Sequence, residues 1–286
     1  MKKVHTMKGA KVGFIGCGVM GEALIRAICR QINPEQVFLF DTDAAKSSQL
    51  TKELGCTQVK NAGDIALKAT HIFLAVKPAV VPSVLKEIAP LFGPAGVLTH
   101  MPVIISIAAG VNLASITGSL VIPGNTDNKI HCIRLMPNLP AIAGESMIAL
   151  CAGSEVETGE IETVKMLLSK AGRVEQVGEN LMDGVTAVSG SGPAYGFMFI
   201  EALADAAVLF GIPRKQAYIY AAQTLKGAAE TVLATGRHPA ELKDSVCSPA
   251  GTTIEAVKVL EEEGFRSAIM KAAQAAFSKS IELGKK

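Results

Sequence analysis

KVGFIGCGVMG, residues Lys11 to Gly21, decides the fold class of this chain. A short apolar strand leads into Gly16, Gly18 and Gly21, which have GxGxxG spacing, and an apolar-faced helix follows. The first glycine permits a tight turn, the second lets the backbone approach a pyrophosphate, and the third lets helix and strand pack closely. We therefore expect a dinucleotide site formed by Gly16, Cys17, Gly18, Val19 and Met20.

A second strand, Val37 to Phe40, ends at Asp41. An acidic side chain at this position normally accepts hydrogen bonds from the adenosine ribose and repels a ribose phosphate, which favours NAD over NADP. Lys46 lies nearby in sequence and would weaken that preference. The expected cofactor is therefore NADP or NAD, with Asp41 favouring NAD.

Short apolar strands alternate with helical patterns in the first part of the chain, at His71–Val76, Ile104–Ala108, Cys132–Met136 and Met147–Cys151. This alternation predicts a doubly wound α/β sheet. Ligands of open parallel sheets bind outside the carboxyl ends of the strands. The strand ends that we expect near the cofactor are Ala75, Val76, Lys77 and Pro78, then Ala109, and the Met136–Asn138 turn.

Strand patterns stop at about Gly178, and alanine-rich helical patterns follow. We expect a Rossmann-like domain at residues 1–178 and an all-α domain at residues 179–286. The second domain opens with SGSGPAY, Ser189 to Tyr195, which predicts a long helix to Phe210 closed by Gly211. Its many small residues suit tight helix packing within or between subunits.

HPAELKDSVCSPAGTTI, residues 238 to 254, places a Ser-Pro-Ala-Gly turn before Thr252 and Thr253, which open an apolar-periodic helix. A helix start leaves backbone N–H groups without intrahelical partners and carries roughly half a positive charge. A small carboxylate would bind there without an arginine. An ordinary capped helix after a tight turn is the alternative.

The composition argues against several classes of protein. The net charge is only +2, with lysines and acids mixed, so we expect no nucleic-acid partner. The six cysteines have no CxxC and no regular spacing, which predicts neither a metal site nor a disulfide framework. No convincing cleavage site follows the basic N-terminus, and the uncharged apolar stretch near Pro102–Val111 is far shorter than the ~20 residues of a membrane helix. We expect a cytoplasmic protein with no membrane partner.

Taken together, these segments resemble the pyrroline-5-carboxylate reductase family over nearly the full length of the chain. The resemblance implies an NAD(P)H-dependent oxidoreductase that reduces 1-pyrroline-5-carboxylate to L-proline, the last step of proline biosynthesis. It also implies a homodimer formed through the C-terminal helices and leaves a higher homo-oligomer open. The segments that carry it are GFIGCGVMG, FLAVKP (Phe73–Pro78), SIAAGV (Ser106–Val111), MPNLP (Met136–Pro140), SGSGPAY and HPAELKDSVCSPAGTTIEAV.

The resemblance also implies roles for individual residues. The glycine loop, the Lys77-Pro78 strand end and Ala109 would hold the dinucleotide, with Glu179 beside the nicotinamide. Backbone N–H groups of the SPAGTT turn would hold the substrate carboxylate, and the Thr253 hydroxyl would contact the ring nitrogen as the catalytic group. The expected substrate-binding residues are Ser248, Gly251, Thr252 and Thr253.

Two departures from the family pattern leave other functions open. This chain has Ala250 where the family usually has glycine, and Leu139 where it usually has threonine. A methyl group in a left-handed backbone at Ala250 would cost about 1 to 2 kcal/mol. A dinucleotide-binding sensor without turnover is therefore one alternative. A β-hydroxyacid dehydrogenase is another, but its catalytic lysine has no counterpart after Gly192 until Lys215.

Overall fold

The computed structural model describes residues 9–92, 96–98, 101–122 and 129–284, and the chain forms two compact units. The first unit runs to Gly190 and includes the end of the chain from Phe277, and the second comprises Ser191–Ala276. Residues 179–190, which follow the domain boundary expected at Gly178, pack with the sheet of the first unit, where Met182 is buried in one cluster with Ala149 and Cys151.

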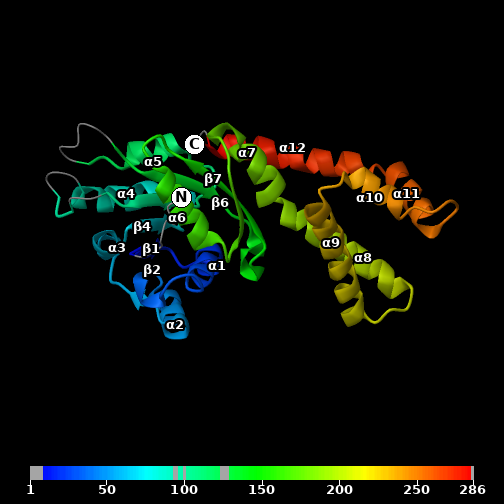
Figure 1. Cartoon of the computed structure of the whole chain (residues 1–286), viewed down its shortest axis with the longest axis horizontal. Helices are drawn as coiled ribbons and strands as arrows, with labels where there is room; N and C mark the ends of the chain where they lie inside the picture. The colour runs from blue at the N-terminus through cyan, green and yellow to red at the C-terminus, as the bar shows by residue number, and fades with distance from the viewer. Residues whose placement is uncertain (1–8, 93–95, 99–100, 123–128, 285–286) are drawn as a thin grey trace, which may run out of the picture. The chain divides into compact units, whose positions relative to one another are not determined.

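The first unit is built on an eight-stranded sheet with the order β3-β2-β1-β4-β5-β6-β7-β8 (Figure 1). Neighbouring strands are parallel except for β6 and β7, which are antiparallel. The predicted Rossmann-like α/β fold is thereby confirmed. The strands are β1 Val12–Ile15, β2 Val37–Phe40, β3 Thr57–Gln58, β4 His71–Leu74, β5 Val103–Ser106, β6 Cys132–Met136, β7 Ser146–Ala152 and β8 Gly172–Gln176.

Two of these strands were not predicted, and both lie at edges of the sheet. β3 has only two residues, so no periodicity is detectable in it. β8 has the sequence GRVEQ and no fully buried residue, so it lacks the apolar run of a buried strand. An edge strand pairs on one side only and tolerates charged side chains. The backbone pairing with β7, and not an apolar pattern, defines β8.

Helices cover both faces of the sheet, because two separate apolar clusters form against it. One cluster joins the sheet to α1 and α6, and the other joins it to α3, α4 and α5. The helices of the first unit are α1 Val19–Ile28, α2 Ala44–Leu54, α3 Ala62–Lys68, α4 Val81–Ile88, α5 Leu113–Ser119, α6 Thr158–Leu168 and α7 Met182–Val185. Its shorter helical turns are η1 Pro34–Gln36, η2 Pro78–Val80, η3 Ala89–Leu91, η4 Leu139–Ala143, η5 Glu179–Leu181 and the π-helical η6 Thr186–Gly190.

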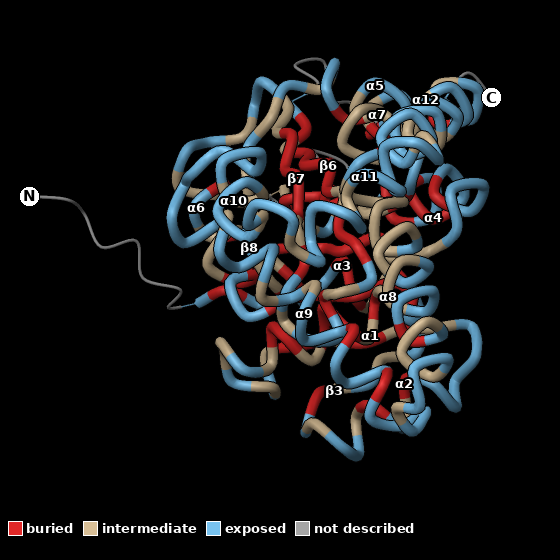
Figure 2. The backbone as a smooth tube through the Cα atoms, turned by 90° about the vertical axis from the view of Figure 1, so that its right-hand side faces the viewer, coloured by how far each residue is buried: buried red, intermediate tan, exposed pale blue. Residues whose placement is uncertain are grey.

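The central strands form the best-buried part of the first unit, and Figure 2 shows their backbone in red. Phe14 of β1 and Phe73 of β4 stack with ring centroids 4.6 Å apart and an interplanar angle of 13°. Both side chains are fully buried. Aromatic stacking of this kind adds about 0.5 to 1.5 kcal/mol to the energy of burial. The strands that carry the glycine loop and the Ala75 turn are therefore held rigidly together.

The second unit is helical, as predicted. It contains α8 Gly192–Leu209, α9 Arg214–Thr235, α10 Pro239–Ser245, α11 Thr252–Glu262 and most of α12 Phe265–Gly284. Pro193 lies in the first turn of α8, and Gly211 closes it with φ of +87°, as the SGSGPAY segment predicted. Its buried cluster consists of small side chains, Ala204, Ala217 and Ala221.

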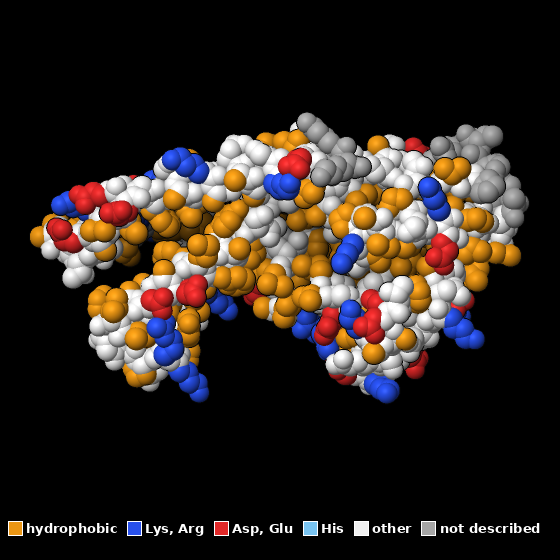
Figure 3. Space-filling view, turned by 180° about the vertical axis from the view of Figure 1, so that it is seen from behind, with side chains coloured by type: hydrophobic (Ala, Val, Ile, Leu, Met, Phe, Trp, Pro, Cys, Tyr) orange, Lys and Arg blue, Asp and Glu red, His pale blue; other side chains and the backbone are white. Residues whose placement is uncertain are grey.

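Large apolar side chains lie exposed on the surface of the second unit, as the orange side chains of Figure 3 illustrate. Leu209 is 84% exposed and Phe210 is 81% exposed. An 18-residue window of the helical run Glu179–Leu209 has a mean hydropathy of 1.2, so by length and composition alone the run would suffice to cross a membrane. Exposed apolar surface of this extent marks an interaction site.

Candidate active site

The glycine loop joins β1 to α1 at the carboxyl edge of the sheet. Gly16 has φ of +103°, and a Cβ there would lie 2.5 Å from the Ala75 carbonyl oxygen. A Cβ on Gly21 would lie 2.7 Å from the Gly16 oxygen. A Cβ on Gly18 would meet no atom within 4 Å. Packing therefore requires glycine at the first and third positions, whereas the second position leaves open space for a ligand.

The Asp41 carboxylate fixes this loop to the end of β2. Its Oδ2 accepts a hydrogen bond from the Cys17 backbone N–H over 2.6 Å, and its Oδ1 accepts one from the Asp43 N–H over 2.8 Å. The Gly16 N–H also donates to the Phe40 carbonyl, over 2.8 Å. A carboxylate has about four acceptor positions, so Asp41 retains capacity for the two hydroxyls of a ribose.

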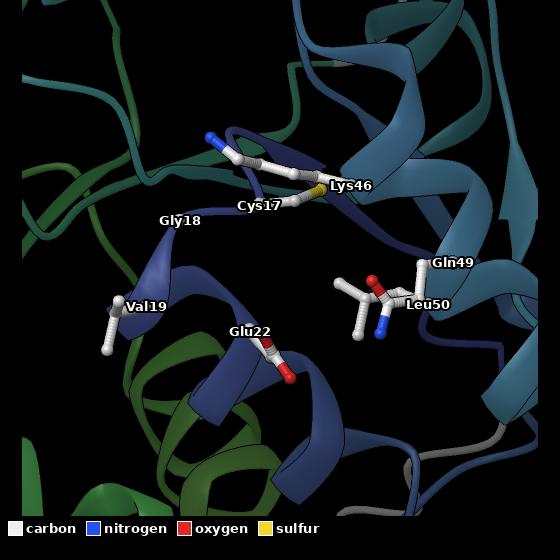
Figure 4. A pocket seen from close by; sticks show the side chains of 7 residues that line it. All are labelled: Cys17, Gly18, Val19, Glu22, Lys46, Gln49 and Leu50. Atoms are coloured by element: carbon white, nitrogen blue, oxygen red, sulfur yellow. The ribbon is translucent and has the colours of Figure 1, made fainter.

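A cavity of about 240 Å³ opens beside the loop, between the first turn of α1 and the first two turns of α2. The Lys46 side chain extends along its rim toward the loop, Glu22 approaches from α1, and Gln49 approaches from α2 (Figure 4). The Lys46 Nζ lies 3.6 Å from the Asp43 carboxylate. The residues that line the cavity are Cys17, Gly18, Val19, Glu22, Lys46, Gln49 and Leu50.

The N-terminus of α1 faces the open side of the loop with an unsatisfied positive end. Gly18 is its N-cap residue, and no side chain caps the helix within the part of the chain that the structure describes. Backbone N–H groups at such an end, together with the helix dipole, bind phosphate groups. The loop and the helix terminus therefore offer open space and N–H donors that could hold the phosphates of a dinucleotide.

Cys17 lies in the middle of the loop but is not a reactive thiol. Its side chain is buried, and burial together with the nearby Asp41 carboxylate raises the pKa of the thiol to about 12. The thiolate is the nucleophilic form of cysteine. The Cys17 side chain therefore fills space under the loop.

The other predicted strand ends lie along the same edge of the sheet, because β4 lies between β1 and β5. Val76 is within 3.2 Å of the position of a Cβ on Gly16. Lys77 is exposed and precedes the short helix η2, with Pro78 as the first residue of that helix. Ala109 is exposed in the turn after β5, and Gly110 follows with φ of +78°. The structure thus places Ala75 and Val76 against the glycine loop, and Lys77, Pro78 and Ala109 after the ends of neighbouring strands.

Glu179 binds the start of α5, a contact that the sequence did not predict. Its Oε1 accepts a hydrogen bond from the Leu113 N–H over 2.7 Å and lies 3.6 Å from Nη1 of Arg134. Arg134 is only 5% exposed. The one sequence signal for this pair is a charged residue inside the buried strand CIRLM. The carboxylate therefore anchors α5, which follows the turn that contains Ala109.

Asn138 joins the end of β6 to the π-helix η6. Its Nδ2 donates to the Ser189 carbonyl over 2.9 Å, and its Oδ1 accepts from the Ser146 hydroxyl over 2.8 Å. The side chain is 8% exposed, so these hydrogen bonds satisfy a buried amide. Leu139, the second departure from the family pattern, is 41% exposed at the start of η4. The hydrogen bonds of Asn138 with Ser189 and Ser146 therefore do not depend on which side chain is present at position 139.

The predicted substrate residues lie in the second unit, in the turn between α10 and α11. Ala250 has φ of +55° and is the non-glycine residue with positive φ among those that the structure describes. The Gly251 N–H donates to the Ser248 carbonyl over 3.0 Å, and a Cβ on Gly251 would lie 2.3 Å from the Ser248 hydroxyl. The turn is therefore tight, and its backbone adopts the left-handed conformation considered from the sequence.

This turn leads directly into α11. Gly251 is the N-cap residue, and no side chain of the described residues caps the helix. The Thr252 and Thr253 side chains are exposed in its first turn. By contrast, α10 is capped by His238, whose Nδ1 accepts a hydrogen bond from the Ala240 N–H over 3.2 Å. His238 therefore has a structural role, and the uncapped start of α11 is the end with N–H groups available to an anion.

Comparisons with known proteins extend over almost the whole chain. The pyrroline-5-carboxylate reductase of Escherichia coli is 43% identical over 277 residues, which cover 96% of this chain and 98% of that protein. The chain belongs to the pyrroline-5-carboxylate reductase family. Residues 179–283 match the family model for pyrroline-5-carboxylate reductase dimerisation, and residues 11–110 match the model described as NADP oxidoreductase coenzyme F420-dependent. Membership of this family argues against the β-hydroxyacid dehydrogenase alternative.

Solved structures of pyrroline-5-carboxylate reductases have the same fold. The enzyme from Coxiella burnetii is 30% identical with a TM-score of 0.85, covering 97% of this chain and 99% of that one. The Plasmodium falciparum enzyme, with NADP bound, is 31% identical with a TM-score of 0.83, covering 98% of this chain and all of that one at 100%. The predicted fold and family are therefore confirmed, and the dimerisation match supports a homo-oligomer.

Proposed function

We propose that this reductase converts 1-pyrroline-5-carboxylate to L-proline with NADPH or NADH as hydride donor, which is the last step of proline biosynthesis. The observation that carries the proposal is 43% identity to the Escherichia coli pyrroline-5-carboxylate reductase over 96% of the chain. Reduction of a carbon-nitrogen double bond needs a hydride at the imine carbon and a proton at nitrogen. The reduced nicotinamide, when bound, supplies the hydride.

The first unit would bind the dinucleotide. Gly16 and Gly21 shape the loop, the open space at Gly18 admits the pyrophosphate, and the N-terminus of α1 neutralises its charge. Asp41, which binds the Cys17 N–H of the loop, would accept hydrogen bonds from the adenosine ribose, with Lys46 on the rim of the cavity beside the loop. Cys17, Val19, Met20, Ala75, Val76, Lys77, Pro78 and Ala109 complete the proposed cofactor site.

The charges around the cavity bear on the choice of cofactor. Asp41 already orders the loop and would oppose a ribose phosphate, which favours NADH. Lys46 is the positive group on the cavity rim, and Asp43 at 3.6 Å partly neutralises it. We therefore infer that both cofactors bind, with NADH favoured by the carboxylate and NADPH tolerated through the lysine.

The Ser248–Thr253 turn would bind the substrate. Its carboxylate would accept hydrogen bonds from backbone N–H groups at the start of α11, flanked by Ser248, Gly251 and Thr252. The Thr253 hydroxyl would hydrogen-bond the ring nitrogen and orient the iminium, which is more electrophilic than a neutral imine. Positioning of this kind can supply roughly 7 to 11 kcal/mol of a reaction barrier, so no strongly basic or acidic side chain is required.

The exposed apolar helices of the second unit would be covered by a second copy of the chain. We propose a homodimer formed through residues 179–283, because this segment matches the dimerisation model and carries Leu209 and Phe210 on its surface. Burial in that interface would also account for the apolar character of Glu179–Leu209. All six cysteines are free thiols, which supports a reducing, cytoplasmic location.

The test is the oxidation of NADH and of NADPH by the purified protein with 1-pyrroline-5-carboxylate, measured in parallel. We expect imine-dependent oxidation of both cofactors and formation of L-proline. A 3-hydroxyacid with the oxidised cofactors is the control and should give no reaction. Dinucleotide binding without imine turnover would overturn the proposal and favour the sensor alternative.

A further inference from the structure

Two cysteines of the first unit meet at the ends of the helices that enclose the cavity. Cys29 lies at the C-terminal end of α1, and Cys56 follows Gly55, which ends α2. Their Sγ atoms are 3.3 Å apart. A disulfide requires an S–S separation of about 2.05 Å, so a small movement of the two side chains brings the sulfurs to bonding distance.

The surroundings of this pair differ from those of the other buried cysteines. The hydrogen bond with the Cys29 thiol lowers the pKa of Cys56, whereas burial raises the pKa of Cys132 to about 11. The same hydrogen bond, together with burial, raises the pKa of the Cys29 thiol, and Arg26 only partly opposes this rise. A thiol exchanges with disulfides through its thiolate, so Cys56 is the member of the pair that starts the exchange, and it is better suited to do so than Cys17 or Cys132.

The pair is also connected to the cavity. α1 begins at the glycine loop, and α2 carries Lys46 and Gln49 of the cavity wall. Between the cavity and the cysteines, Arg26 of α1 joins Glu22 over 2.8 Å and Glu53 of α2 over 2.5 Å. Leu50 of α2 also lies in one buried cluster with Leu24 and Ile28 of α1, and a close-packed interior has few voids to absorb a displacement. Drawing the C-terminal ends of α1 and α2 together would therefore change the cavity at their N-terminal halves.

We propose that Cys29 and Cys56 form a reversible disulfide that lowers the affinity of this chain for its dinucleotide. The oxidant is a small-molecule disulfide such as oxidised glutathione. One cysteine thiolate attacks it, forms a mixed disulfide and releases one reduced glutathione. The second cysteine, after losing its proton, attacks the mixed disulfide and releases another, so two electrons pass from the protein to the glutathione. The effect on affinity rests on the proposed dinucleotide site, but the formation of the disulfide does not.

The full chain is incubated with oxidised glutathione, digested with trypsin without reduction, and examined by mass spectrometry. We expect residues 27–30, AICR, to be linked to residues 53–60, ELGCTQVK. NADH binding is then measured by fluorescence for the reduced and oxidised protein. The oxidised protein should bind NADH several-fold more weakly, and dithiothreitol should restore the affinity.

Variants test whether this pair causes the change. After treatment with oxidised glutathione, Cys29→Ser and Cys56→Ser should still bind NADH as tightly as the untreated, reduced protein does. Cys151→Ala leaves the pair intact and should lose NADH affinity on oxidation, as the parent chain does. Circular dichroism checks that each variant folds, and the peptide mapping on the parent chain requires no variant. A linkage through other cysteines, no linkage, or a linked pair with unchanged NADH affinity would overturn the proposal. A reduced protein that binds no dinucleotide would instead contradict the proposed function.

Discussion

The Cys17 backbone N–H donates a hydrogen bond of 2.6 Å to the Asp41 carboxylate, which links the glycine loop to the end of β2. One side chain thus orders the loop and places a negative charge beside it. We predict that Asp41→Ser shifts the preference from NADH toward NADPH, because it removes the charge that opposes a ribose phosphate. A hydrogen bond to a charged group contributes about 1.5 to 3 kcal/mol, so the kcat/KM for NADH should fall by roughly tenfold or more.

The measurement is the ratio of kcat/KM values for the two cofactors. Asp41→Asn is the matched control, because it keeps an acceptor for the Cys17 N–H and removes the charge. It should shift the ratio with less loss of activity. A ratio that stays unchanged in both variants would remove Asp41 from the ribose site.

Gly16 and Gly18 should respond differently to substitution by alanine. Gly18→Ala should leave the free energy of unfolding within about 0.5 to 1 kcal/mol of the parent chain, because its Cβ meets nothing and its φ of −67° is ordinary. It should weaken dinucleotide binding, since the methyl group enters the ligand space. Gly16→Ala should destabilise the fold by more than that, because its Cβ would lie 2.5 Å from the Ala75 oxygen. Urea unfolding and NADH titration separate the two effects, and equal losses of stability would contradict this assignment.

Thr253→Ala should lower imine reduction while leaving dinucleotide affinity unchanged. The loss of one hydrogen bond to the ring nitrogen corresponds to about 1 to 3 kcal/mol, or roughly ten- to hundredfold in kcat/KM. Thr253→Ser retains the hydroxyl and should retain most of the activity. Unaltered turnover in Thr253→Ala would show that the hydroxyl has no part in the reaction.

Ala250→Gly should stabilise the chain. The left-handed backbone, with φ of +55°, costs alanine about 1 to 2 kcal/mol, and the extra freedom of glycine in the unfolded chain offsets about 0.5 to 1 of this. The expected net gain is therefore about 0.5 to 1 kcal/mol in urea unfolding. Ala256→Gly, inside α11, is the control and should destabilise by about 1 kcal/mol. A loss of stability in both variants would indicate that the turn is not strained.

His71 should make stability fall in mild acid. Burial lowers the pKa of His71 to about 4, and its Nε2 has no hydrogen-bond partner among the described residues. The folded chain therefore keeps the ring neutral, and the stability due to this shift is present above about pH 6.5 and lost as the pH falls toward 4. Between neutral pH and about pH 5, roughly 2 kcal/mol should be lost. The free energy of unfolding, measured with urea at both pH values, should differ less for His71→Leu than for the parent chain. An equal difference would show that His71 does not cause the loss of stability in acid.

Local sterics made the first half of the site predictable from the sequence. The spacing of Gly16, Gly18 and Gly21 reports contacts within one strand-loop-helix unit, and Asp41 follows from the next strand. The sequence also raised the possibility of a left-handed backbone at Ala250, and the structure has this conformation there. In these cases the deciding interactions lie within a short segment or between adjacent strands.

Contacts between distant segments could not be predicted in the same way. The Glu179 carboxylate meets the Leu113 N–H across 66 positions of sequence, and Arg134 reaches the same carboxylate from another strand. Cys29 and Cys56 are separated by 27 positions, and neither has a spacing that suggests a pair. Strand β8 was missed because its pairing with β7, and not its own side chains, makes it a strand.

The core of the second unit consists of Ala204, Ala217 and Ala221, while Leu209 and Phe210 are exposed. Small side chains bury little apolar area, so this unit gains only a modest part of its stability from its own interior. When association of two copies covers the exposed apolar surface of this unit, folding is coupled to assembly, and stability depends on the protein concentration. The melting temperature of the chain should therefore rise with its concentration, and dilution alone should act on this protein as a mild denaturant.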